Sequence, residues 1–203
     1  MAVFAKAPVA GAVKTRLAAI LGPQGAAGLH AELVRRALAT AVASRASSVE
    51  LWCSPDARDP FFARCATEFG VALRTQEGED LGERMRRAFE AAFANGRALV
   101  IIGGDCPALA PRDVSAALDA LAEYDAVLAP AEDGGYVLIG LARPVAALFE
   151  SIAWGGAGVM DATRARLAAA GVRWKELGTL WDVDRPEDYA RMIREGLLGK
   201  ALT

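Results

Sequence analysis

The sequence predicts an α/β fold, a three-layer αβα sandwich around a mostly parallel, Rossmann-like sheet. Short apolar runs alternate with longer helical patterns along the whole chain. Within one helical pattern the apolar residues Leu29, Leu33 and Ala37 recur every four positions and form one face. The 203 residues, 54% of them hydrophobic, are enough for one core, so we expect a single domain over residues 1–203.

The predicted strands are the short β-rich runs, which lie at residues 2–5, 49–53, 72–75, 98–102, 126–129, 136–141 and 172–176. Helices are predicted over residues 23–44, 81–95 and 159–170, after Pro111, and from Pro186, because proline suits the first turn of a helix. The segment "VLAPAEDGGYVLIGL" differs, since two apolar runs are joined by turn-forming residues with no room for a helix. It predicts an irregular or antiparallel excursion of the sheet.

Charge and composition exclude several classes of protein. The formal net charge of −2 argues against general nucleic-acid binding, which needs a basic face. No apolar run approaches the roughly 18 residues of a membrane span, and the first residues do not resemble a secretory signal. The three cysteines form no CxxC pair, so we expect reduced thiols in a cytoplasmic protein. The single histidine, His30, lies in a helical pattern, which favours a structural role over a catalytic one.

The opening segment "AKAPVAGAVKTRL" carries Lys6, Lys14 and Arg16, and the first carboxylate of the chain is Glu32. It follows the first predicted strand, turns at Gly11 and then enters a helical stretch. Backbone N–H groups at a helix start favour an anion, and nearby cations strengthen this preference. The segment therefore predicts a phosphate-binding loop, although it lacks the glycines of a Walker P-loop. The alternative is a solvated basic turn.

Two further segments place carboxylates after predicted strands. In "ALVIIGGDCPAL", Asp105 follows a central strand and two glycines, which favours a ligand of a hard divalent cation. Its alternative role is to cap a turn. In "LWDVDRPEDYARM", Asp184 is placed as the N-cap of the helix that begins near Pro186, which leaves Asp182 free. Asp105 and Asp182 on two loops would then share one Mg²⁺ beside phosphates held by the basic loop.

The segment "PAEDGGYVLIGL" is a candidate site for a sugar or an acceptor. Its carboxylates would orient an acceptor hydroxyl, its glycines would allow close approach, and its tyrosine would stack on or hydrogen-bond a ligand. The candidate residues are Glu132, Asp133, Gly134, Gly135 and Tyr136. A tight turn explains the same residues. For the following Trp154 we expect burial rather than a place in a lid.

Four segments in order, "FAKAPVAGAVKTRL", "GGDCPAL", "APAEDGGYVLIGL" and "DVDRPEDY", are similar to recurrent segments of the DUF2064 family. The resemblance covers almost the whole chain. That family is placed with the nucleotide-diphospho-sugar transferases of GT-A fold, in some descriptions as glycosyltransferases. The stretch "VKTRLAAILG" also resembles a segment of the 2-phospho-L-lactate guanylyltransferases, which transfer nucleotides.

The resemblance implies a nucleotide bound over the opening loop, with Lys6, Lys14 and Arg16 on its phosphates. It also implies that Asp105 and Asp182 hold Mg²⁺ or Mn²⁺. Lys14, Arg16 and Asp105 would then carry the catalytic roles, while the segment EDGGY faces the sugar or acceptor. The chain departs from the family pattern at Ala10, Arg185 and Gly156, none of which is a proposed ligand.

Two chemistries fit these residues. In nucleotidyl transfer a phosphorylated acceptor attacks the α-phosphate of a nucleoside triphosphate, and dense cations on the opening loop favour this reaction. In glycosyl transfer an acceptor attacks the sugar carbon of a nucleotide sugar, and the family description favours that one. A different class, a non-catalytic nucleotide-binding or regulatory domain, is the alternative to both. The base, the sugar, the small-molecule acceptor and the oligomeric state are not determined by the sequence.

Overall fold

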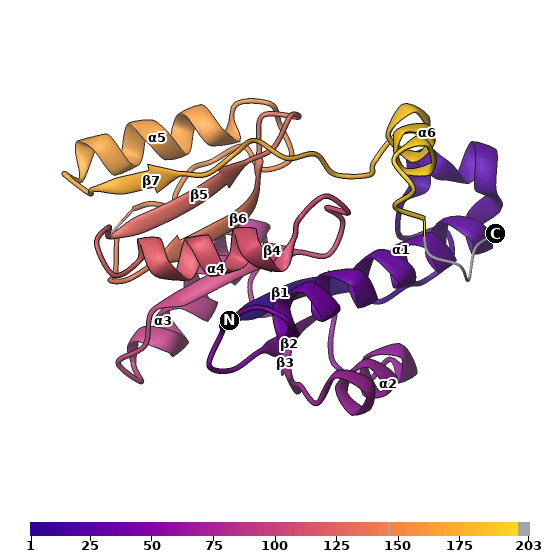
Figure 1. Cartoon of the computed structure of the whole chain (residues 1–203), viewed down its shortest axis with the longest axis horizontal. Coiled ribbons are helices and arrows are strands. Elements are labelled where there is room, and N and C mark those ends of the chain that lie inside the picture. Colours follow the sequence, from indigo (N-terminus) through magenta and orange to yellow (C-terminus); the bar gives the residue numbers. More distant parts are fainter. Residues whose placement is uncertain (146, 199–203) are drawn as a thin grey trace.

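A computed structural model describes residues 1–145 and 147–198 of the chain (Figure 1). Its seven-stranded sheet has the order β3-β2-β1-β4-β6-β5-β7. The strands are β1 (Ala2–Lys6), β2 (Glu50–Ser54), β3 (Ala72–Thr75), β4 (Leu99–Gly103), β5 (Ala126–Pro130), β6 (Tyr136–Leu141) and β7 (Trp174–Glu176). The α-helices are α1 (Ala18–Val42), α2 (Pro60–Phe69), α3 (Leu81–Phe93), α4 (Pro111–Ala120), α5 (Val159–Ala169) and α6 (Pro186–Arg194), and a 3-10 turn, η1, covers Thr15–Leu17.

Helices cover both faces of the sheet. One buried cluster joins α1, α2 and α4 to residues such as Val3, Leu51 and Ile102. A second cluster joins α3 and α5 to the alternate strand residues, among them Phe4 and Ile101. Because side chains alternate along a strand, each face of the sheet contributes to a different cluster. The structure confirms the predicted three-layer αβα sandwich.

One strand breaks the parallel order of the sheet. Strand β6 is antiparallel to both β4 and β5, whereas β1, β2, β3 and β4 pair in parallel, as do β5 and β7. Strands β5 and β6 form a hairpin whose turn, residues 131–135, therefore lies at the edge where the parallel strands end. This confirms the antiparallel excursion predicted for residues 127–141.

A third cluster lies at one end of the molecule, where α6 packs beside the first half of α1 (Figure 1). It joins Leu29 and Leu33 of α1 to Trp181, Val183 and Met192. Helix α1 is broken near its start, where Gly22 has φ +68° and Pro23 begins the second helical segment. The predicted start at residue 23 matches this second segment.

Three further features of the fold bear on the sequence expectations: helix α2, the cysteines and the lengths of the helices. Helix α2 was not predicted, although Asp59 caps it through a 2.8 Å bond from the Phe61 backbone N–H and Pro60 opens it. The three cysteines are all buried and free, and burial raises the pKa of the Cys65 thiol to about 11. No helix within the described residues is long and apolar enough to cross a membrane.

Candidate active site

The topology brings distant loops together at the carboxyl ends of the parallel strands. The Val183 backbone N–H donates to the Asp105 carbonyl at 3.0 Å, so the segment before α6 runs beside the end of β4. The Glu132 N–H donates to the Leu180 carbonyl at 2.9 Å, which joins the same segment to the β5–β6 turn. In open α/β sheets ligands bind at this edge. The predicted candidate segments therefore meet at the expected place.

Lys14 is held at this site by its backbone conformation and by an ion pair with Asp105. Its backbone is left-handed, with φ +46°, a conformation that few residues other than glycine adopt. Its side chain is only 6% exposed, and its Nζ donates to Asp105 Oδ2 at 3.1 Å. The loop before it is folded by short backbone bonds, including Ala12 N–H to the Val9 carbonyl at 3.0 Å, and by Gly11 at φ +81°. The opening loop thus aims one buried ammonium group at the predicted metal carboxylate.

The two predicted metal ligands differ in their electrostatic surroundings. The nearby Lys14 ammonium holds the pKa of Asp105 below its usual range. Burial, together with the negative charges of Asp105 and Asp133, raises the pKa of Asp182 to about 6. Burial is the larger cause, and the neighbouring carboxylates add to it, while the Lys14 ammonium acts in the opposite direction. A cation bound beside Asp182 would favour its charged form.

This donor set fits a divalent cation shared with a substrate. In the described part of the chain no three His, Cys, Asp or Glu side chains form a complete cage. Mg²⁺ is commonly held by one or two carboxylates together with substrate phosphates and waters. Asp105 and Asp182, with Lys14 beside them, match that arrangement.

The other two cations of the opening segment have different surroundings. Arg16 forms an exposed ion pair with Asp184, so it is not without an acidic partner. Lys6 is exposed and forms no ion pair within residues 1–145 and 147–198. The expectation that Asp184 caps the last helix was wrong. Arg185 is at the N-cap, and Asp188 accepts bonds from the backbone N–H groups of Arg185 at 2.7 Å and Asp184 at 3.1 Å.

The β5–β6 turn is tightly built. Asp133 Oδ1 accepts a 2.8 Å bond from the Gly135 N–H, as in an Asx turn. Gly134 has φ +90°, and its carbonyl accepts from the Met160 N–H at 2.8 Å. The turn therefore packs against the first turn of α5 and against Ala157 just before it, with the exposed Asp133 next to the site.

Glu132 and Tyr136, both predicted to face the acceptor, have partners within the protein. Glu132 accepts two bonds from Arg191 Nη1, at 2.9 and 3.0 Å, and Arg191 lies 4.3 Å over the Trp181 ring. The half-buried Tyr136 directs its hydroxyl to Met85 Sδ at 3.8 Å, toward α3, and burial raises its pKa. Of the five residues predicted to face the acceptor, Asp133, Gly134 and Gly135 are thus the ones without a side-chain partner elsewhere in the described protein, and Asp133 is exposed.

His30 and Trp154 have structural surroundings, as expected. His30 is 8% exposed, and its Nε2 lies 3.0 Å from the Lys6 carbonyl, where a donated bond ties α1 to the opening loop. Burial lowers the pKa of His30. The indole of Trp154 is half-buried and packs so closely on Gly82 that a Cβ there would lie 2.5 Å from the ring.

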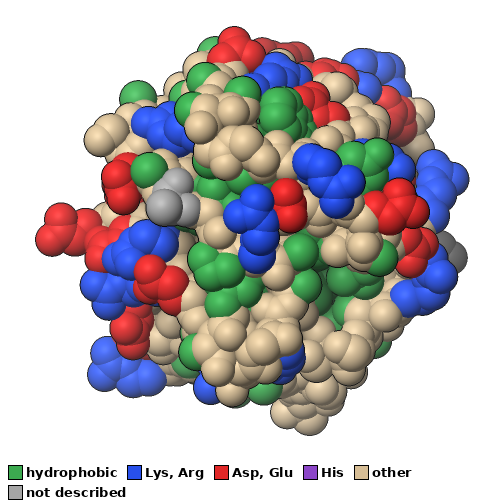
Figure 2. Space-filling view, turned by 90° about the vertical axis from the view of Figure 1, so that its left-hand side faces the viewer, with side chains coloured by type: hydrophobic (Ala, Val, Ile, Leu, Met, Phe, Trp, Pro, Cys, Tyr) green, Lys and Arg blue, Asp and Glu red, His purple; other side chains and the backbone are tan. Residues whose placement is uncertain are grey.

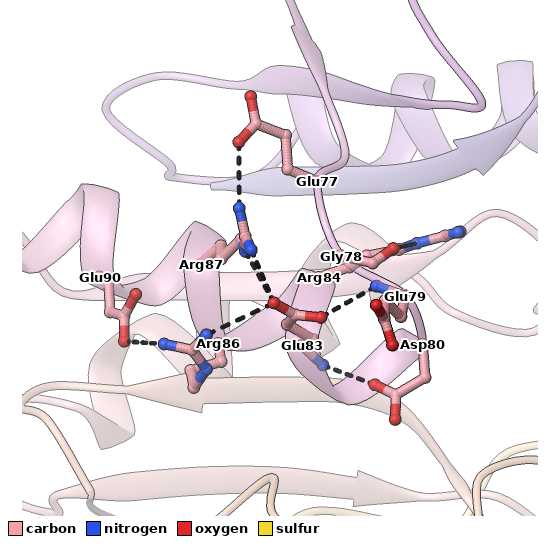
Figure 3. Close-up of polar contacts among 9 residues, drawn as sticks. All are labelled: Glu77, Gly78, Glu79, Asp80, Glu83, Arg84, Arg86, Arg87 and Glu90. Carbon is pink, nitrogen blue, oxygen red and sulfur yellow. Dashed lines mark hydrogen bonds and ion pairs between the residues drawn. The ribbon is translucent and has the colours of Figure 1, made fainter.

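Sequence reasoning missed a polar group at the ends of β2 and β3. The buried Gln76 donates from Nε2 to the Trp52 carbonyl at 2.7 Å, and Arg84 donates to Ser54 Oγ at 3.1 Å and to the Gly78 carbonyl at 3.0 Å. Figure 3 shows the neighbouring Arg86 and Arg87 turned toward carboxylates, whereas Arg84 contacts a carbonyl. Gln76 follows directly after a β-rich run, which is the signal that identified Asp105.

A surface cavity of about 470 Å³ lies elsewhere, between α3 and residues 144–145 and 147–150. Leu141, which lines it, pairs with Leu99 at the start of β4, so the cavity is at the opposite edge of the sheet. Figure 2 shows that edge, where charged side chains of both signs surround several separate hydrophobic areas. This cavity is not part of the candidate active site.

The chain is similar to known proteins over most of its length. Residues 37–156 match the family described as "Uncharacterized protein conserved in bacteria (DUF2064)". A Rubrobacter xylanophilus protein named phosphoenolpyruvate guanylyltransferase is 33% identical over 202 residues, 97% of this chain and 96% of that protein.

Solved structures show the same fold. A protein of Desulfovibrio desulfuricans G20, described as a nucleotide-diphospho-sugar transferase, has a TM-score of 0.82 and 34% identity over 91% of this chain and 81% of its own. A nucleotidyl transferase of Methanothermobacter thermautotroptrophicus has a TM-score of 0.61 and 17% identity, and covers 97% and 96% of the two chains. The chain is therefore a transferase that belongs to the DUF2064 family.

Proposed function

We propose that this protein is a metal-dependent nucleotidyltransferase that transfers GMP from GTP to a small phosphorylated carboxylic acid, of which phosphoenolpyruvate is the first candidate. The observation that carries the proposal is the meeting of the buried Lys14 ammonium with Asp105 and Asp182 at the carboxyl edge of the sheet. The name of the Rubrobacter relative supports the choice of guanine and of the acceptor.

In this reaction a phosphate oxygen of the acceptor attacks the α-phosphorus of GTP. A new P–O bond forms, the bond to the β-phosphate breaks, and pyrophosphate leaves with that electron pair. Negative charge therefore grows on the leaving phosphates, and we assign Lys14 and Lys6 to stabilise it. Mg²⁺ or Mn²⁺ held by Asp105 and Asp182 would supply Lewis-acid stabilisation of the phosphate oxygens.

The order of the strands separates the two substrates. The opening loop follows β1, and the polar group of Ser54, Gln76 and Arg84 lies on one side of it, at β2 and β3. The β5–β6 turn lies on the other side, beyond β4. The triphosphate at β1 therefore favours a nucleoside over β2 and β3, and an acceptor beside the turn of residues 131–135.

Two features favour nucleotidyl over glycosyl transfer. The opening segment supplies Lys6 and Lys14, with Arg16 beside them paired to Asp184, and we assign this positive charge to the departing phosphates of a triphosphate. Tyr136 and Glu132, which would have served a sugar, bond to Met85 and Arg191 instead. These contacts engage two of the side chains that the sequence assigns to a sugar.

The test measures pyrophosphate release from GTP, ATP, CTP or UTP, each with phosphoenolpyruvate and with Mg²⁺ or Mn²⁺. We expect release with GTP, and ³¹P NMR should show a new P–O–P linkage in the product. Asp182→Asn should lower kcat by at least about 100-fold. The matched control is Asp119→Asn. It removes an exposed carboxylate on α4 that pairs with Arg45, and it should keep wild-type activity. Release of a nucleoside diphosphate from a nucleotide sugar would instead establish glycosyl transfer, and binding without turnover would establish a regulatory domain.

A further inference from the structure

The ion pair between Lys14 and Asp105 joins two groups with different roles in the proposed reaction. Lys14 is assigned to the phosphates, whereas Asp105 is assigned to the divalent cation. In the structure the Lys14 Nζ lies 3.1 Å from Asp105 Oδ2, and its side chain is 6% exposed. Lys14 therefore occupies space at the oxygen that a metal would need.

We propose that Lys14 is a placeholder for the divalent cation: it neutralises Asp105 in the ligand-free protein and moves to the phosphates when nucleotide and metal bind. This inference rests on the proposed function, since it concerns the order in which the same site is filled. It assigns a second role to a residue whose first role is to bind phosphate.

The carboxylates of the site favour a nearby cation in both states. Asp182 lies near Asp105 and near Asp133, so without a positive charge these carboxylates would repel one another. The backbone of Lys14 is held at φ +46° by the folded opening loop, which keeps the stem of the side chain in place. Its four-carbon chain can still turn about its own bonds and redirect the ammonium without moving the loop.

The Asp105 side chain is open enough for such an exchange. It is 41% exposed, whereas that of Lys14 is 6% exposed, so a hydrated cation can approach the carboxylate from the solvent side. An incoming polyphosphate offers Lys14 several anionic oxygens in place of the one it leaves. A metal ion alone must compete with the Lys14 ammonium for Asp105, whereas a metal ion that arrives with nucleotide meets a lysine already drawn to the phosphates. Each ligand should therefore increase the affinity of the protein for the other.

If Lys14 is a placeholder, loss of its charge should change the two binding affinities in opposite directions. Nucleotide should bind more weakly, as at any phosphate site, but the metal alone should bind more tightly. A lysine that serves only the phosphates would show the first effect without the second. Lys6 provides this comparison, because it is exposed and forms no ion pair with a described residue.

The experiment titrates the purified full chain with Mn²⁺ alone and follows free Mn²⁺ by electron paramagnetic resonance. Lys14→Met should bind Mn²⁺ about five- to tenfold more tightly than wild type, whereas Lys6→Met should match wild type. Lys14→Arg, which keeps the charge, should remain at the wild-type affinity. In wild type, GTP should tighten Mn²⁺ binding at least about tenfold.

Equal Mn²⁺ affinity in wild type and Lys14→Met would overturn the inference, whatever the enzyme turns over. If Lys14→Met does not fold, failure of GTP to tighten Mn²⁺ binding in wild type would overturn it as well. The proposed function is tested separately by pyrophosphate release in the wild-type protein. A placeholder lysine with no release would mean that the site binds its ligands but catalyses another reaction.

Discussion

The turn between β5 and β6 allows a sharp test of how steric fit holds the candidate site together. Gly134 has φ +90°, and a Cβ built on it would lie 2.1 Å from the Ala157 carbonyl oxygen and 2.7 Å from its carbon. Real Cβ atoms do not approach backbone so closely, and the Gly134 carbonyl is also bonded to the Met160 N–H at 2.8 Å. In Gly134→Ala either the turn or the segment before α5 must therefore move.

The cost of Gly134→Ala has two parts. A side chain at positive φ costs about 1–2 kcal/mol, and forcing extra volume into a packed site costs about 1–3 kcal/mol more. We expect a total loss of about 2–5 kcal/mol in the free energy of unfolding. For a chain of this size that lowers Tm by roughly 6–15 °C.

Gly70→Ala is the matched control, because Gly70 ends α2 at φ +65° and no atom lies within 4 Å of the position that a Cβ would take. It should show the backbone cost alone, about 1 kcal/mol. Urea denaturation of both variants, with the midpoint and slope fitted separately, measures the difference. Losses equal within about 0.5 kcal/mol would refute the steric argument.

Three further predictions concern residues outside the proposed catalytic chemistry. Phe89→Ala removes a ring that is 2% exposed and whose centroid lies 5.6 Å from that of Phe149. It should lower the free energy of unfolding, measured by urea denaturation, by about 3–5 kcal/mol. A loss below about 2 kcal/mol would mean that neighbouring side chains fill the space. The bonds from Arg143 lower the pKa of Asp125 to about 2, so the stability that this carboxylate adds is complete above its unfolded pKa and disappears as the pH falls toward 2. After allowance for screening, Asp125→Asn should cost about 1 kcal/mol at pH 6 and almost nothing at pH 2, and a difference independent of pH would contradict this. His30→Phe removes the bond to a carbonyl of the opening loop and should cost about 1–2 kcal/mol at pH 7. Because burial lowers the pKa of His30, wild type should lose stability as the pH falls below about 6.5, and the variant should lack that loss in thermal unfolding from pH 7 to 5.

The position of the candidate site could be predicted because the rule behind it is topological. Asp105 and Asp182 follow predicted strands, and the ends of parallel strands share one edge. Their partners could not be predicted, since Lys14 and Asp105 are 91 positions apart and nothing local links them. For the same reason the sequence assigns Arg16 and Glu132 to ligands, whereas the structure shows the carboxylate and the guanidinium that they bond.

Local signals explain the remaining differences in the fold. The N-cap of α6 is Arg185, one residue later than predicted. The Asp188 side chain accepts bonds from the backbone N–H groups of Asp184 and Arg185 and so fixes the start of the helix there. Helix α2 carries an Asp-Pro start like that of a standard capped helix and was predictable. The left-handed Lys14 was not, because its backbone conformation is set by the folded opening loop rather than by the preference of a lysine.

The antiparallel β6 has a consequence for how specificity could diversify. A hairpin needs no crossover helix, so the turn beside the proposed acceptor connects the end of β5 directly to the start of β6. Apart from the proposed metal ligand Asp182, the segments proposed to hold the nucleoside and its phosphates precede residue 110, whereas the turn of residues 131–135 and the start of α5 that supports it follow it. In the proposed enzyme, changes to this later part can alter the choice of acceptor while the machinery for the triphosphate is inherited intact.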